Sequence, residues 1–305
     1  MTIAFKAMPD EKADNRARTE PTQRQLMVRR ILGHGGLMIG GSLMAALVLL
    51  AIFAPLVAPY DPFDQNLPQR LLPPFWVAGG NPDHWLGTDH LGRDYLSRLL
   101  YGARVSLMIG FGAASIGCLI GVTLGVCAGY FGGVVDRAIS FILTCQLALP
   151  GLLLAMALVF LIGPSVPVVI VVIGLLHWTY YLVVTRTATQ QIRNLDYVTA
   201  ARAIGSSHRQ IIVSEILPNL LNHVIVIFTL EVGVAILAEA ALSFLGVGIQ
   251  PPTPSWGLMI AEGKTSIFFR PWLVILPGAF IFILVIATNL LGDGLRDVTA
   301  PENRG

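Results

Sequence analysis

Two carboxylates stand inside an otherwise apolar stretch of this 305-residue chain. Glu231 and Glu239 are the only charged residues between positions 224 and 247. An ionised carboxylate in lipid is costly unless it faces water or a partner. In a helix the two would lie about 12 Å apart along the axis. Two interpretations are open: the carboxylates line a path by which a solute crosses the membrane, or each makes a structural hydrogen bond to a neighbouring helix.

Other residue types that could carry chemistry are poorly placed for it. Residues 263–265, Gly-Lys-Thr, resemble the end of a phosphate-binding loop, but Leu258 replaces the glycine that the motif requires five positions earlier. The three cysteines lie in apolar runs and form no C-x-x-C pair. His177, next to aromatic residues, is interpreted as part of the belt at the membrane surface rather than as a ligand. The sequence therefore predicts no catalytic residue, no bound cofactor and no metal site.

The composition is that of a membrane protein. Charged residues make up 12% of the chain and hydrophobic residues 54%, whereas roughly 25% of the residues in a soluble domain are charged. The formal net charge is only +2, and the basic residues are scattered along the sequence. This pattern excludes an ordinary soluble enzyme and does not favour nucleic-acid binding.

Six apolar segments are long enough to cross a bilayer as helices, which takes about 20 residues each. We therefore predict an all-α, polytopic bundle of six transmembrane helices. A polar tail (1–36) precedes the first span (37–58), a long loop (59–104) leads to a core of five spans (105–292), and a short tail (293–305) follows. The predicted spans are Leu37–Ala58, Val105–Tyr130, Ala138–Ile162, Val166–Val184, Val224–Val247 and Leu273–Leu291.

Lysine and arginine are unevenly distributed between the connecting segments. With the N-terminus inside the cell, the inner segments hold 14 of the 20 basic residues and the outer segments hold 6. Because cytoplasmic flanks carry the excess of Lys and Arg, we expect both terminal tails to be cytoplasmic. In the outer loop, Arg93, Arg98 and Arg104 are expected to form an interfacial helix whose arginines reach lipid headgroups. The rest of that loop either contacts a partner outside the membrane or caps the bundle.

Glycines recur at four-residue intervals in the second span. The four are Gly117, Gly121, Gly125 and Gly129. Small residues at this spacing let two helix backbones approach closely in lipid. We therefore predict a helix–helix contact on this face, made either within the chain or with a second membrane protein.

The inner segment 185–223 has the pattern of two short helices set at an angle. Asp196 is predicted to cap a first helix that runs to Ala203, and Ser206 or Ser207 to cap a second. Gly205 between them allows a sharp turn. The apolar residues of both recur at helical spacing, so the pair can lie on a surface or fill a groove.

This segment resembles the EAA loop, the signature of permease subunits in bacterial binding-protein-dependent ABC importers. The residues that keep the spacing of the motif are Thr199, Ala200, Ala201, Gly205, Leu217 and Pro218. The chain departs from the motif where Thr199 replaces its glutamate and where Glu215 occupies the position of an isoleucine. Stretches 86–107, 242–257 and 289–297 are similar to the C-type permeases of dipeptide, oligopeptide and nickel importers.

The resemblance implies a MetI-like permease of the bacterial inner membrane that forms half of a translocation pathway for di- or oligopeptides or similar small solutes. Its implied partners are a homologous B-type permease, two cytoplasmic ATP-binding subunits that use ATP and Mg²⁺, and a periplasmic substrate-binding protein. The helices beside Gly205 would dock on an ATPase and act as a lever. Two alternatives remain: an ion-coupled secondary transporter that uses Glu231 or Glu239, and a passive channel or scaffold.

Overall fold

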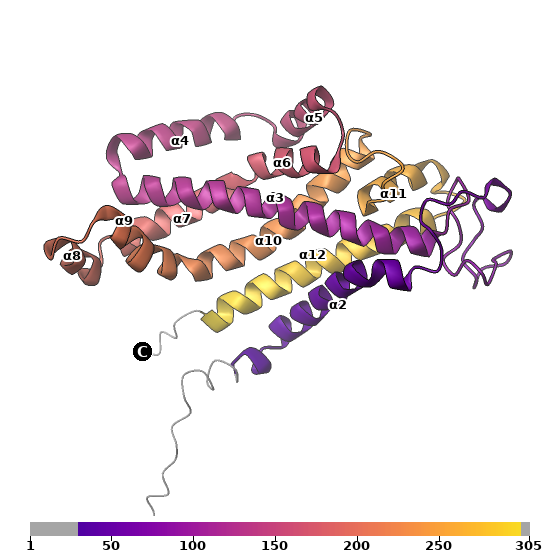
Figure 1. Ribbon diagram of the computed structural model, residues 1–305, viewed down its shortest axis with the longest axis horizontal. Coiled ribbons are helices and arrows are strands. Elements are labelled where there is room, and N and C mark those ends of the chain that lie inside the picture. Colours follow the sequence, from indigo (N-terminus) through magenta and orange to yellow (C-terminus); the bar gives the residue numbers. More distant parts are fainter. Residues whose placement is uncertain (1–29, 300–305) are drawn as a thin grey trace, which may run out of the picture.

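The computed structural model describes residues 30–299 (Figure 1). Residues 1–29 of the predicted N-terminal tail and residues 300–305 of the C-terminal tail lie outside the described residues. Within 30–299 there is no β-strand, only an isolated bridge between Thr88 and Asp94. The longer helices are α2 (Gly35–Val57), α3 (Tyr95–Phe131), α4 (Gly133–Leu147), α5 (Gly151–Ile162), α6 (Val166–Leu176), α7 (Trp178–Ile192), α10 (Leu217–Phe244) and α12 (Trp272–Thr299). The shorter ones are α8 (Asp196–Ala203), α9 (His208–Ile211) and α11 (Trp256–Gly263), with 3-10 turns at Leu67–Gln69 and Lys264–Ser266 and a π turn at Ile212–Ile216.

The predicted all-α membrane architecture is confirmed. In the described range five helical stretches are long and apolar enough to span a bilayer, and α4 with α5 makes a sixth crossing if this bent pair counts as one span. Several helices extend past the predicted apolar runs. α3, for example, begins at Tyr95 rather than Val105, because charged residues at a helix end can stay helical outside the hydrocarbon.

The third predicted span, Ala138–Ile162, is wrong as one straight helix. α4 ends at Leu147, α5 begins at Gly151, and the two bend by 84°. Pro150 lies at the break. Proline has no N–H to donate to the preceding turn and disfavours the helical conformation of the residue before it, so the helix ends there.

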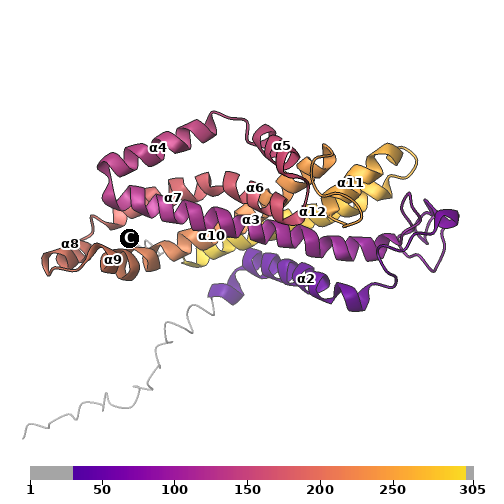
Figure 2. The ribbon, with the colours of Figure 1, turned by 45° about the horizontal axis from the view of Figure 1, so that its top comes forward.

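The helices form three layers around α3. In both Figures 1 and 2, α4 and α5 lie on one side of α3 and α2 lies on the other. One end of the bundle carries α8 and α9, and the opposite end carries α11 and the segment between α2 and α3 (Figure 1). His34 Nε2 lies 3.1 Å from Asp297 Oδ2, so the start of α2 and the end of α12 lie next to each other.

The glycine face of α3 packs against α7 within this chain. A Cβ added at Gly117 would lie 3.3 Å from the backbone of His177, and one added at Gly129 would lie 2.6 Å from the carbonyl oxygen of Arg186. Gly121 and Gly125 are crowded in the same way by the α7 backbone. The stripe therefore allows close backbone contact along most of α7.

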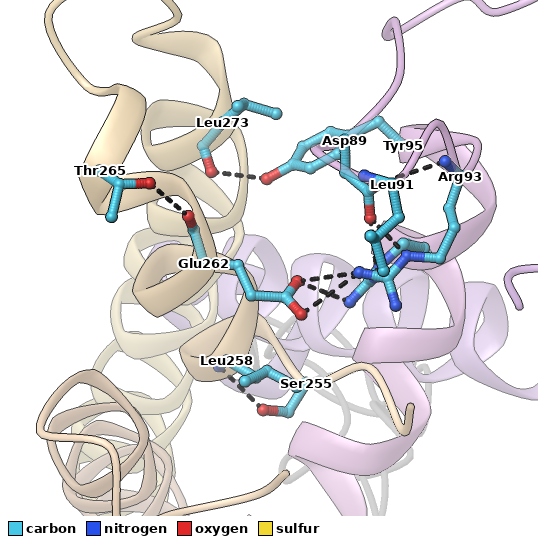
Figure 3. Close-up of polar contacts among 10 residues, drawn as sticks. Asp89, Leu91, Arg93, Tyr95, Ser255, Leu258, Glu262, Thr265 and Leu273 are labelled. Carbon is cyan, nitrogen blue, oxygen red and sulfur yellow. Dashed lines mark hydrogen bonds and ion pairs between the residues drawn. The ribbon is translucent and has the colours of Figure 1, made fainter. Parts of the chain in front are cut away.

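The predicted interfacial arrangement is wrong for Arg93 and Arg98, which lie just before α3 and in its first turn and are buried. Arg93 and Arg98 are 1% and 0% exposed, and both bind carboxylates instead of reaching for headgroups. We call Asp89, Arg93, Arg98 and Glu262 the ion cluster. Figure 3 shows Asp89, Arg93 and Glu262 of this cluster. Arg104 sits at the bundle surface, with its guanidinium 5.8 Å from the centre of the Tyr101 ring.

Candidate translocation and coupling site

The segment between α7 and α10 forms two short helices, as its sequence predicts. α8 begins at Asp196, with Leu195 rather than Asp196 in the capping position. Ser207 caps α9, its hydroxyl accepting a hydrogen bond from the Gln210 N–H at 3.3 Å. Between them Gly205 has φ +87°, and a Cβ there would meet nothing within 4 Å. Glycine is therefore required by the backbone conformation and not by lack of space.

One face of this segment is anchored to the ends of α3 and α7. Val198, Ile211 and Ile216 are at most 1% exposed and pack with Tyr130 and Ile192. The Tyr130 hydroxyl lies 2.9 Å from His208 Nδ1. The two short helices therefore rest on the ends of α3 and α7.

The other face is free in this chain. Ile204, at the tip of the turn, is 83% exposed, and Tyr197 and Val213 are also exposed. Of the motif residues, Thr199, Ala200, Gly205 and Pro218 are exposed, while Ala201 and Leu217 are half-buried. The segment thus presents an apolar tip on a rigid base.

A π turn at Ile212–Ile216 joins α9 to α10. Pro218 follows it and cannot donate a backbone hydrogen bond to the preceding turn. The Asn219 amide donates to the Glu215 carbonyl at 2.6 Å and to the Tyr197 hydroxyl at 3.2 Å. These bonds tie α8 to the start of α10.

Glu231 lines a cavity of about 650 Å³ that is bordered by residues of α7, α10 and α12. Its Oε2 is 2.8 Å from Nδ1 of His177, the residue at the break between α6 and α7. The side chains of Glu231 and His177 are 7% and 18% exposed. The cavity is lined by Leu176, His177, Thr179, Tyr180, Val184, Ile227, Leu230, Glu231, Val234 and Asn289.

A second cavity of about 180 Å³ shares Leu176 and His177 with the first. It lies toward the C-terminal part of α10, where Ala238 and Leu242 line it. Together the two cavities follow one face of α10, since their lining residues on that helix recur every three or four positions: Ile227, Leu230, Glu231, Val234, Ala238 and Leu242. From the first to the last this face extends about 22 Å, most of the thickness of a bilayer core.

Glu239 lies away from these cavities. It is 0% exposed and accepts hydrogen bonds from the hydroxyls of Ser243 and Ser255, at 2.7 and 2.8 Å. Ser255 in turn caps α11 by accepting from the Leu258 N–H. Glu239 therefore fastens α11 to α10, which is the structural interpretation of this residue, and it does not enter the solute path proposed below.

The ion cluster joins the start of α3 to α11. Arg98 donates to Asp89 at 2.7 Å and to Glu262 at 2.8 Å, and Arg93 donates to the same carboxylates at 2.6 and 3.2 Å. Burial raises the pKa of Glu262, and the attraction of Arg93 opposes that effect. Oxygen and nitrogen atoms of Asp89, His90 and Glu262 lie within 4.8 Å of one another, but the two arginines already balance both carboxylates, which disfavours a metal cation there.

Sequence reasoning missed the roles of His177 and of the ion cluster. The position of His177 in the predicted span Val166–Val184 could have indicated its role. It lies eleven positions into that span, which places it near the centre of the bilayer rather than in a surface belt. Arg93 and Arg98 gave no such signal, because Glu262 is 169 and 164 residues away in sequence.

These long apolar helices define a polytopic helical membrane protein. Residues 121–305 match the family model described as binding-protein-dependent transport system inner membrane component, and residues 22–74 match the N-terminal transmembrane domain of oligopeptide transport permease C. The chain therefore belongs to the binding-protein-dependent inner-membrane permeases.

Curated relatives extend over nearly the whole chain. The dipeptide transport system permease protein DppC of Haemophilus influenzae is 42% identical, covering 88% of this chain and 90% of the relative. The di/tripeptide permease DppC of Pseudomonas aeruginosa is 44% identical, with 87% and 88% covered. The glutathione permease GsiD of Pectobacterium atrosepticum is 37% identical, with 90% and 89% covered.

Solved structures share the fold at low sequence identity. A chain of the MetNI methionine ABC transporter, in an inward-facing conformation, aligns with a TM-score of 0.56 and 19% identity, covering 67% of this chain and 98% of that chain. A chain of an amino acid ABC transporter aligns with a TM-score of 0.51 and 16% identity, covering 65% and 92%. The predicted MetI-like bundle is confirmed by these neighbours.

Proposed function

We propose that this chain is one permease subunit of an ATP-driven importer for short peptides. It pairs with a homologous B-type permease, two cytoplasmic ATP-binding subunits that consume ATP and Mg²⁺, and a periplasmic substrate-binding protein. Family membership supports the class of transporter, and relatives named for dipeptide, di/tripeptide and glutathione transport support the substrate class. The end of the bundle that carries α8 and α9 faces the cytoplasm in this proposal, in line with the excess of basic residues there.

The observation that carries the proposal is the rigid, apolar-tipped segment formed by α8 and α9. Its buried face packs on α3 and α7, and its exposed face offers Ile204 to a partner. In the proposed mechanism, nucleotide-driven closure of the ATP-binding subunits pushes this segment. Because helices transmit a push that a flexible loop would absorb, the spans then rock between outward and inward openings.

A substitution at Gly205 tests this lever without filling any occupied space. Gly205→Val places a β-branched residue at φ +87°, where even an ordinary L-residue costs about 1–2 kcal/mol. We expect the complex to assemble but to hydrolyse ATP with little uptake of dialanine in proteoliposomes. Gly278→Ala is the matched control, because a Cβ at Gly278 also meets nothing within 4 Å and its φ is not in the left-handed range.

Two results would contradict the proposal. ATP-dependent uptake at the normal rate by the Gly205→Val complex would show that the segment formed by α8 and α9 does not act as a lever. Transport by the purified chain alone in liposomes, with no ATP-binding subunit and no second permease, would favour the secondary transporter or the channel instead.

A further inference from the structure

We infer that the Glu231 carboxylate, paired with His177 in the cavity between α7, α10 and α12, is a binding site within the membrane for the protonated amino end of the transported peptide. The inference rests on the proposed function and adds to it a site of solute recognition in this chain, separate from selection by any binding protein.

The charges around the cavity favour a cationic ligand. Among its ten lining residues Glu231 is the single acid, and none is Lys or Arg. His177 supplies one hydrogen bond, to Oε2. The other carboxylate oxygen, Oε1, has no hydrogen-bond partner among residues 30–299, although the side chain is only 7% exposed. A carboxylate that is largely shielded from water is stabilised by a cation that can approach this free oxygen.

The remaining lining fits the rest of a short peptide. Leu176, Ile227, Leu230 and Val234 supply apolar surface, while Asn289 and Thr179 supply uncharged polar groups. The volume of about 650 Å³ lies within the roughly 300–1,000 Å³ that is usual for small-molecule sites. One ammonium group joined to a short, mostly neutral body is the ligand class that this lining matches.

The position of His177 between the two cavities places the inferred binding site on the proposed path of the solute. His177 and Leu176 border both cavities, so a solute that moves along the α10 face passes the His177–Glu231 pair. The peptide ammonium approaches Oε1 while the imidazole keeps its hydrogen bond to Oε2, so the two groups share one carboxylate.

Binding to the complex without its binding protein tests this site directly. The probes are dialanine and N-acetyl-dialanine, which differ in the amino group that the site is inferred to recognise. We expect the wild-type complex in lipid nanodiscs to bind dialanine about tenfold or more tightly than the acetylated probe, the scale of a charge-assisted hydrogen bond. Glu231→Gln should bring this ratio close to one, while Glu239→Gln, the same change on the same helix outside the cavities, should keep it.

A second variant predicts a change of opposite sign. His177→Ala removes the group that shares the carboxylate and leaves Glu231 unpaired, so the preference for free dialanine should rise. If the His177–Glu231 hydrogen bond were only structural, His177→Ala and Glu231→Gln would change the preference for free dialanine in the same direction. The His177→Ala measurement also tests the inference if the Glu231→Gln complex fails to assemble.

The outcomes separate this inference from the proposed function. A wild-type ratio near one, a ratio unchanged by Glu231→Gln, or a ratio unchanged or lowered by His177→Ala would each overturn the inference, even if the full complex imports dialanine with ATP. Absence of ATP-dependent uptake by the full wild-type complex would instead refute the proposed function.

Discussion

Removing Glu262 should destabilise the protein far more than removal of an ordinary surface carboxylate. Glu262 balances Arg93 and Arg98 together with Asp89, so the ion cluster is neutral as a whole. Glu262→Ala leaves two guanidinium groups on one carboxylate. The unbalanced positive charge has little access to water, since the side chains of Arg98, Arg93 and Asp89 are 0%, 2% and 4% exposed.

The burial of the cluster sets the size of the effect. Exposed ion pairs contribute about 0–1 kcal/mol, whereas breaking a buried pair by removing one partner costs about 3–5 kcal/mol. Glu262 is itself 13% exposed, so we expect a loss near the lower end, about 3 kcal/mol. The double variant Glu262→Ala/Arg93→Ala restores neutrality with Arg98 on Asp89. It should therefore cost less than the sum of the two single variants by about 1–3 kcal/mol.

Denaturant unfolding of the purified protein in detergent, followed by tryptophan fluorescence, measures these differences. Asp64→Ala is the control, because Asp64 is an exposed carboxylate in the segment between α2 and α3 and makes no ion pair with the described residues. It should change the free energy of unfolding by no more than about 0.5 kcal/mol. The reasoning is refuted if Glu262→Ala costs less than about 1 kcal/mol, or if the single losses are additive in the double variant.

Two further substitutions test other parts of the structure. Gly121→Leu drives a side chain into the α7 backbone at Trp178, and overpacking of this kind costs about 1–3 kcal/mol or more. We therefore expect a lower yield of folded protein in membranes, while the yield of the control Gly278→Ala stays unchanged. Normal yield and stability of Gly121→Leu would contradict the α3–α7 packing. Ile204→Glu places a charge on Ile204, which is 83% exposed at the tip of the turn. It should leave the free energy of unfolding unchanged but reduce co-purification of the ATP-binding subunits about tenfold or more. Undiminished co-purification would argue against docking at this tip.

The apolar runs were enough to predict most of the bundle, because the length of hydrocarbon to be crossed is fixed. They could not predict its bends. Pro150 was visible within the third run, yet only the structure shows that the chain bends there by 84° between α4 and α5. The glycine spacing likewise predicted a close contact, and only the structure identifies α7 as the partner.

The polar groups were the hardest part of the site to predict. Glu231 and Glu239 have similar surroundings in sequence, but one borders a cavity and the other is enclosed by two serine hydroxyls. The difference is the helix face on which each lies relative to α7 and α11. Such a distinction depends on contacts between segments far apart in sequence, which a single sequence does not specify.

The helix α2 lies at the side of the bundle, which bears on how such permeases diversify. α2 packs on α12 and α3, with Gly40 against Leu291, and supplies no residue to either cavity beside His177. A separate family model describes this N-terminal region, and the methionine-transporter chain is almost fully matched by only 67% of this chain. A change in the length or sequence of α2 would therefore leave the residues that line both cavities in place.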